Sequence, residues 1–186
     1  MTSTRSRAKA PARLAVVDEA AAQAIGLAQR GRMILDIAAA DLEVAEARLG
    51  AFHETTWFFR NALNEARRAW DRLRAEVGGA ILKEAERALP REVLSVGDDG
   101  RGNPRATFVP ILGKTYRAER VEGSPLVVVL WRLTGLTDSD DGPYYVSRLK
   151  DGSTRCDCAE WVYQVADVED APPCKHLQAL EALGWL

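Results

Sequence analysis

The sequence has 186 residues and is poor in cysteine and histidine, with only three cysteines, two histidines and 7% aromatic residues. So few cysteines cannot form the dense disulfide framework of a small secreted domain, and an odd number leaves at least one unpaired. We therefore expect an intracellular, reducing location, the cytoplasm, where thiols that bind metal stay reduced.

The sequence also lacks a long apolar run and an excess of positive charge. No apolar run is long enough to span a bilayer, so we expect no membrane association. The 25 basic and 27 acidic residues give a net charge of -2, which is not the signature of a polyanion-binding protein. Residues 1–10 are an exception, since they are basic and contain no acid. We predict a disordered tail there, either simply solvated or able to touch nucleic acid.

Residues 11–90 are rich in alanine, leucine, glutamate and arginine, which are strong helix formers. Apolar or small residues recur at alternating steps of three and four, the spacing of a coiled-coil seam. This helical arm is either an antiparallel hairpin that turns within 50–56, with Thr55 or Thr56 capping the second helix, or one long helix that forms a homo-oligomer. We favour the hairpin because a helix of this length is unusual without a partner.

The C-terminal half carries signals for strands. Glycine, aspartate, asparagine and proline gather in 96–104, so 91–105 is predicted to be a linker or loop. Strands are expected at 106–112, 115–121 and 125–134. Residues 126–131 are continuously apolar, which predicts a central strand buried on both faces. The fold class is therefore α+β, with the helical arm followed by a small antiparallel sheet unit at 106–186.

All three cysteines and one histidine lie in two short motifs, Cys156-Asp157-Cys158 and Cys174-Lys175-His176. Three thiolates and an imidazole are the ligands of a closed tetrahedral zinc site. Strands are predicted at 144–149 and 154–158 around an Asp-Gly turn, and a helix at 175–183. Residues two apart on a strand point to the same side, so Cys156 and Cys158 would present both sulfurs to one ion.

This C-x-C, a variable loop and then C-x-H opening a terminal helix resembles the SWIM-type zinc finger. Trp161, Tyr163 and Lys175 are similar to the aromatic and basic residues often found in that family. The resemblance covers residues 144–183. It implies a ββα fold and a binding role toward DNA or proteins. It also implies that zinc is held by these ligands: Cys156, Cys158, Cys174 and His176.

Other interpretations of the same residues remain open. Cys156 and Cys158 could form a redox pair, with Cys174 a buried small side chain, but this leaves the C-x-H motif unexplained. A catalytic zinc would keep one open position, with Asp157 or Glu160 as a base. We expect a structural zinc and no enzyme. A protein partner is our first hypothesis because acidic residues outnumber basic ones from residue 138 onward. DNA binding through the finger and the basic tail is the second, and a metal-dependent hydrolase the third.

Overall fold

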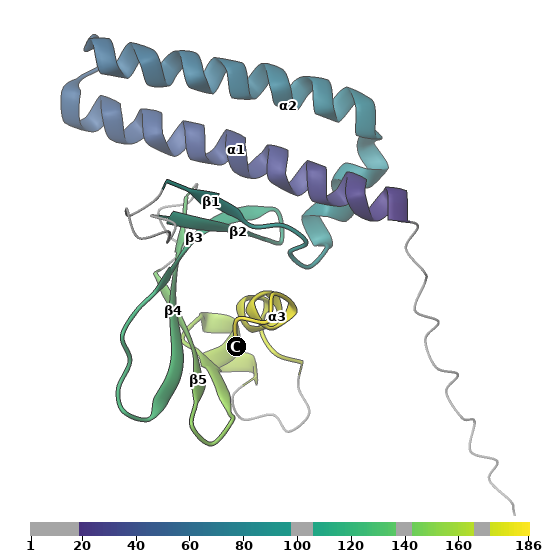
Figure 1. The fold of residues 1–186 in the computed structure, drawn as a ribbon, viewed down its shortest axis with the longest axis vertical. Helices are drawn as coiled ribbons and strands as arrows, with labels where there is room; N and C mark the ends of the chain where they lie inside the picture. The colour runs from purple at the N-terminus through teal and green to yellow at the C-terminus, as the bar shows by residue number, and fades with distance from the viewer. Residues whose placement is uncertain (1–18, 98–105, 137–142, 166–171) are drawn as a thin grey trace, which may run out of the picture.

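The computed structural model describes residues 19–97, 106–136, 143–165 and 172–186, so the predicted basic tail at 1–10 lies outside the described residues. The fold is α+β, as predicted: a long helical hairpin, a six-stranded antiparallel sheet and a C-terminal helix (Figure 1). Among the described residues, no helix is both long and apolar enough to cross a membrane. The elements in chain order are α1 (Glu19–Leu49), α2 (Glu54–Arg87), β1 (Leu94–Val96), β2 (Ala106–Ile111), β3 (Lys114–Arg120), β4 (Val127–Gly135), β5 (Tyr144–Leu149), β6 (Thr154–Cys156), the π-helical turn η1 (Trp161–Val165) and α3 (Lys175–Ala182).

Helices α1 and α2 lie side by side as an antiparallel hairpin, which confirms that prediction and makes the single long helix wrong. The two helices approach closely at Gly31, one of the small residues in the predicted apolar stripe. A Cβ atom on Gly31 would lie 2.7 Å from Cδ2 of Leu73 and 3.1 Å from the ring of Trp70. The absence of a side chain at this position therefore sets the spacing of the helices.

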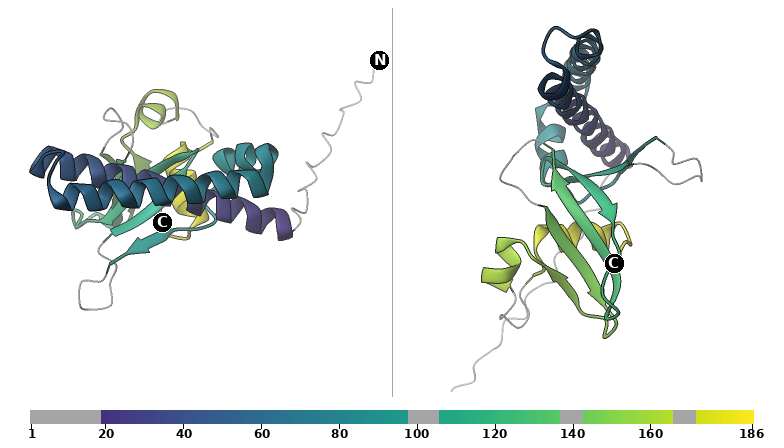
Figure 2. Two further views of the ribbon diagram at one scale, coloured as in Figure 1. Left: turned by 90° about the horizontal axis from the view of Figure 1, so that it is seen from above. Right: turned by 90° about the vertical axis from the view of Figure 1, so that its left-hand side faces the viewer.

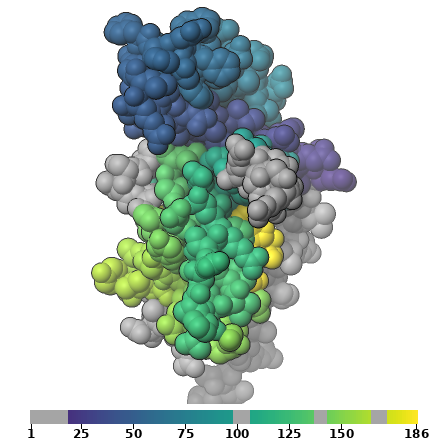
Figure 3. All heavy atoms as spheres, turned by 60° about the vertical axis from the view of Figure 1, so that its left-hand side comes forward, coloured from purple at the N-terminus to yellow at the C-terminus, as the bar shows by residue number. Residues whose placement is uncertain are grey.

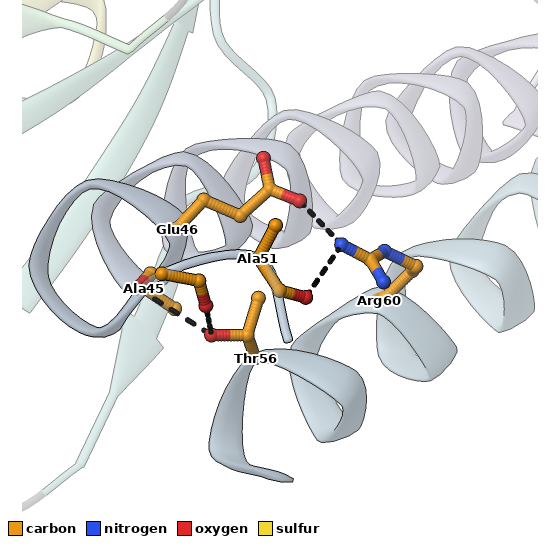
Figure 4. Close-up of polar contacts among 6 residues, drawn as sticks. Ala45, Glu46, Ala51, Thr56 and Arg60 are labelled. Carbon is orange, nitrogen blue, oxygen red and sulfur yellow. Dashed lines mark hydrogen bonds and ion pairs between the residues drawn. The ribbon is translucent and has the colours of Figure 1, made fainter. Parts of the chain in front are cut away.

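The turn of the hairpin is capped differently from the prediction. His53, and neither Thr55 nor Thr56, is the N-cap of α2, and its Nδ1 accepts a 3.2 Å hydrogen bond from Thr55 N. Thr56 is instead fully buried. Its hydroxyl donates to the carbonyl oxygens of Gly50 at 2.8 Å and Ala45 at 3.5 Å (Figure 4). Histidine was not foreseen because Ser, Thr, Asn and Asp are the usual caps.

Arg60 closes the same turn from the second helix. Its Nη2 donates to Glu46 Oε1 at 2.7 Å and to the carbonyl oxygen of Ala51 at 3.2 Å, as Figure 4 also shows. The Glu46 carboxylate belongs to the last turns of α1. One guanidinium thus connects both helices to the loop between them.

The far end of α2 is tied back onto α1 by the amide of Gln29, which is buried. Its Nε2 donates to the carbonyl oxygens of Ala85 at 3.2 Å and Leu89 at 3.3 Å, and its Oε1 accepts from Arg91 N at 3.0 Å. These hydrogen bonds of Gln29 satisfy carbonyl groups that the end of a helix leaves without an intrahelical partner. Earlier in α2, the backbone at Gly78 (φ 75°) interrupts the helix.

The sheet is an antiparallel meander in the order β1-β2-β3-β4-β5-β6. Strand β1 pairs with β2 and lies within the segment, 91–105, that we predicted to be a linker or loop; residues 98–105 of that segment are not described. Leu112 and Gly113 form a two-residue turn that joins β2 to β3. Both turn residues have positive φ (47° and 75°), as a type I′ hairpin requires.

The strand that is buried on both faces is β2 and not, as predicted, the run at 126–131. Phe108, Val109, Pro110 and Ile111 are all buried, and β2 contacts both α1 and α3. In β4, by contrast, the side chain of Val128 is 54% exposed. The long apolar run misled the prediction because the two covering helices lie over β2.

Helix α1 lies across one end of the sheet, where it contacts β2 and β3 (Figure 2). The space-filling view in Figure 3 shows the hairpin stacked directly on the strands. Asp36 of α1 is buried at this junction, and its Oδ2 accepts a 2.7 Å hydrogen bond from Thr115 Oγ1 of β3. The helical arm is therefore part of the folded body.

Candidate metal centre

The two short cysteine motifs converge inside the core between the sheet and α3. Cys156 is the last residue of β6 and pairs with Val146 of β5. Cys158 follows two residues later, Cys174 is the N-cap residue of α3, and His176 lies in its first turn. All four residues are buried, and one ligand atom from each lies within 4.8 Å of the other three. This Cys3His cluster could hold a metal ion.

Backbone N–H groups point at two of the sulfurs. Cys158 N donates to Cys156 Sγ at 3.5 Å, and Trp161 N donates to Cys158 Sγ at 3.4 Å. Both bonds arise because the chain turns sharply after β6 and enters η1. A hydrogen bond donated to a sulfur favours its thiolate form, which is the form that binds metal.

The imidazole of His176 is held between two tyrosine rings. The ring of Tyr144 lies 4.6 Å away at 35°, and that of Tyr116 lies 5.4 Å away and nearly perpendicular. His176 Nδ1 is 3.8 Å from Cys156 Sγ, so this nitrogen faces the sulfurs. Nε2 is buried and has no hydrogen-bond partner among the described residues. A neutral imidazole bound to metal through Nδ1 carries its proton on Nε2.

The three thiols differ in acidity because they share one buried space. A hydrogen bond from Cys156 is the main cause that lowers the pKa of Cys174, to about 4. The pKa of Cys156 is raised by the hydrogen bond between Cys156 and Cys174 and by burial. Burial also raises the pKa of Cys158. One thiolate is thus favoured before any cation binds, and the other two thiols are kept protonated. A divalent cation would favour all three thiolates by offsetting their charge.

The cluster fits a tetrahedral ion in both chemistry and size. In a zinc site with Zn–S near 2.3 Å and Zn–N near 2.0 Å, neighbouring ligand atoms are about 3.5–3.8 Å apart. The 3.8 Å between Cys156 Sγ and His176 Nδ1 matches this separation, and the 4.8 Å limit for the whole set requires side-chain shifts of only about 1 Å. Four protein ligands would complete the coordination, which is the arrangement of closed, structural sites.

The carboxylates beside the cluster are bonded to the backbone. Asp157 Oδ1 accepts a 2.7 Å hydrogen bond from Tyr145 N, and Glu160 Oε2 accepts a 3.4 Å bond from Lys175 N. Strand β6 ends at Cys156, two residues before the predicted end, so Cys158 reaches the cluster from the following turn. Helix α3 begins at Lys175, as predicted.

The aromatic residues of the predicted finger have separate environments. Trp161 packs against the core beside the cluster, whereas Tyr163 is 83% exposed. Trp185 stacks on Trp131 with ring centroids 4.5 Å apart, and its carbonyl oxygen accepts a hydrogen bond from Trp131 Nε1. Sequence reasoning missed Tyr116 as a neighbour of His176, since only the sheet pairing brings β3 near α3.

Comparison of the chain with protein-family models, with curated proteins and with solved structures found no match. The resemblance to the SWIM-type finger therefore rests on the four residues, their spacing and the local strand–turn–helix arrangement around them.

Proposed function

We propose that this protein is a zinc-binding interaction module: a SWIM-type finger with a structural zinc, carried on a helical scaffold, that binds a protein partner. The observation that supports it best is the burial of Cys156, Cys158, Cys174 and His176 with their ligand atoms within 4.8 Å of one another. Three sulfurs and one imidazole that converge in this way form a set of soft ligands, and their thiolate forms would be stable together only with a bound cation.

Zinc is the metal that this ligand set favours. Thiolate sulfurs are soft ligands and imidazole suits zinc well, whereas calcium and magnesium require oxygen ligands. A set of three cysteines and one histidine is one of the usual combinations of structural zinc sites. In the proposal, the ion joins the end of β6 to the start of α3 and so stabilises the C-terminal core.

A structural role is favoured over a catalytic one, and we propose that the protein is not an enzyme. Four protein ligands leave no open position for water or substrate. The two carboxylates that could act as a base, Asp157 and Glu160, accept hydrogen bonds from backbone N–H groups.

The surface proposed for the partner is the turn that follows Cys158. Val162 is 46% exposed and Tyr163 is 83% exposed, while Trp161 of the same turn anchors it to the core. Tyrosine is enriched at interfaces because it combines an apolar ring with a polar end. Because Cys158 begins this turn, a metal bound at the cluster would also fix the shape of the surface.

The nucleic-acid alternative gains no support from the basic residues of the hairpin β5–β6. Arg155 lies opposite Ser147, and Arg148 lies opposite Thr154. Side chains alternate faces along a strand, so Arg148 and Arg155 are on opposite faces of the sheet. A phosphate backbone needs several cations on one face.

The metal is tested by elemental analysis of the purified chain, for which we expect one zinc per molecule. Removal of zinc by a chelator should alter near-ultraviolet circular dichroism, since Trp131, Trp161 and Trp185 pack in the core that contains the cluster. The ellipticity of the long helices should change little, because α1 and α2 contact each other along their length. A chain without bound zinc, and with the same spectra before and after chelation, would contradict the proposal.

The partner surface is tested by crosslinking in cells followed by identification of what is captured. Tyr163→Ala should reduce capture of the specific partner, whereas Leu126→Ala should not. Leu126 is a matched control because it is apolar, 70% exposed and placed at the β3–β4 connection, away from the turn. Equal capture by both variants would show that the turn is not the binding surface.

A further inference from the structure

A second surface, far from the cysteines, is an open groove of about 760 Å³ along one side of the helical hairpin. Both helices and strand β1 line it. Its walls include Ile34 and Ile37 of α1, Phe58 and Phe59 of α2, and Leu94 and Val96 of β1. Three elements therefore contribute to one continuous apolar surface.

The apolar side chains of this groove are open to solvent. Ile34 is 42% exposed, Phe58 is 64% exposed and Val96 is 45% exposed. A contiguous apolar surface of this kind on a folded protein marks a place where something binds. Ala62, Ala66 and Ala69 recur at steps of four and three on α2 and line the groove between the charged residues Glu65, Arg68 and Arg72. They leave room for the close approach of another helix.

The charged residues at the groove are of both signs and balance one another. Asp41 and Glu65 are acidic, and Arg68 and Arg72 are basic. None of the four forms an ion pair with another described residue. Burial raises the pKa of Asp41, which indicates a carboxyl group without enough compensating charge. When two copies of one surface meet, each acidic residue needs a basic residue opposite it. A surface that binds a copy of itself therefore carries unpaired charges of both signs.

We propose that the groove binds a second copy of this chain, so that two hairpins form a four-helix dimer. In a two-fold arrangement, α2 of one copy packs antiparallel against α2 of the other. Glu65 and Arg68 lie three residues apart on the same wall, so each Glu65 meets Arg68 of the other copy, and the alanines face each other at the crossing. The dimer does not depend on the metal centre or on the proposed function of the finger.

The size of the surface agrees with a weak, reversible dimer. Residues 58 to 72 of α2 span about 21 Å along the helix axis, and two adjacent helices are each about 10 Å wide. The helical strip therefore covers about 420 Å², and even with β1 added it is smaller than the roughly 800 Å² per partner of a standard stable interface. In a closed two-fold dimer, the groove of each chain is filled by the other chain. The same groove is then not open to a third chain.

The mass in solution tests the proposal directly. Sedimentation equilibrium of the full chain between about 1 μM and about 1 mM should show a reversible monomer–dimer equilibrium. Zinc loading should not change the dissociation constant, which separates this result from the fate of the finger. A mass of one chain over the whole range would overturn the proposal and would leave the groove to a different kind of partner.

Two aromatic residues supply a matched pair of variants. Phe58→Glu should weaken the dimer by at least about tenfold, because it places a charge on an apolar side chain that lines the groove. Trp57→Glu should leave the dissociation constant nearly unchanged, because Trp57 precedes it on α2, is 62% exposed and does not line the groove. An equal effect of the two variants, with both folded by circular dichroism, would contradict the assignment of the surface.

Charge exchange between copies is the sharper test. Glu65→Arg and Arg68→Glu should each weaken self-association, because like charges then meet across the two-fold axis. An equimolar mixture of the two variants should dimerise again, since each chain then presents charges opposite to those of its partner. Each chain in the mixture still carries its own substitution. Dimerisation can therefore be restored only by contacts between the two different chains. Failure of the mixture to recover would show that Glu65 and Arg68 do not meet.

Discussion

Thr115 Oγ1 of β3 donates a 2.7 Å hydrogen bond to Asp36 Oδ2 of α1, and both side chains are buried. The other carboxylate oxygen, Oδ1, accepts from Arg32 Nε at 2.9 Å on the same helix. The carboxylate of Asp36 therefore connects the helical hairpin to the sheet through the hydroxyl of one threonine. A buried carboxylate of this kind is tolerated only while both oxygens have donors.

Thr115→Val tests that connection. The substitution keeps the shape of the side chain and removes the donor, so we expect a loss of about 1–3 kcal/mol in the free energy of unfolding. Urea denaturation followed by circular dichroism measures it. Thr107→Val is the control, because its hydroxyl is 3.5 Å from Ser95 Oγ at an exposed position, and it should change stability by less than about 0.5 kcal/mol. Similar losses in both variants would contradict a special role for Asp36.

The two histidines of the chain offer a matched test of the metal centre. His176→Ala removes a proposed ligand and should lower zinc affinity by more than the roughly 10- to 100-fold typical for the loss of an outer-shell partner. His53→Ala should retain one zinc and lose only about 1 kcal/mol of stability, since His53 caps α2 by accepting from Thr55 N. Competition with a colorimetric chelator measures the affinity. Equal zinc affinity in the two variants would exclude His176 as a ligand.

The metal-free protein should become more stable as the pH rises from about 4 toward 9. The pKa of Cys174 is lowered to about 4 in the folded chain, so the unfolded chain binds one more proton in this window. The pKa values of Cys156 and Cys158 are raised, so those thiols are protonated in both states there and affect stability only above the window. Denaturation of the chelated protein over pH should show this slope. Cys174→Ser is the comparison, and an unchanged slope in that variant would assign the effect to other groups.

Glycines 31 and 79 test the spacing of the hairpin. Gly79→Ala should stabilise the protein by about 0.5–1 kcal/mol, because a Cβ there meets nothing within 4 Å and alanine is the better helix former. Gly31→Ala has the same intrinsic gain, but its Cβ would lie 2.7 Å from Leu73 Cδ2. We expect Gly31→Ala to be at least about 1 kcal/mol less stable than Gly79→Ala. Thermal melts of the two variants, read at the same wavelength, give the difference.

Local chemistry made much of the fold predictable from the sequence. Helix-forming composition and a stripe of apolar residues predict two long helices, and Gly50 marks the turn between them. Asp151 and Gly152 predict the β5–β6 hairpin, where Asp151 Oδ1 accepts from Ser153 N. The spacing of Cys156, Cys158, Cys174 and His176 indicates a common site because a short hairpin and one helix start bring them together.

The sequence by itself determined the features that depend on neighbours in the chain: helix, turn, and the pairing of two short cysteine motifs. Only the tertiary structure decided which strand is buried on both faces, that β1 joins the sheet, and that Thr56 lies inside the hairpin turn. It also placed His176 between Tyr116 and Tyr144 and brought Asp36 against Thr115. The physical reason is that burial depends on which elements pack together, and those contacts join residues far apart along the chain.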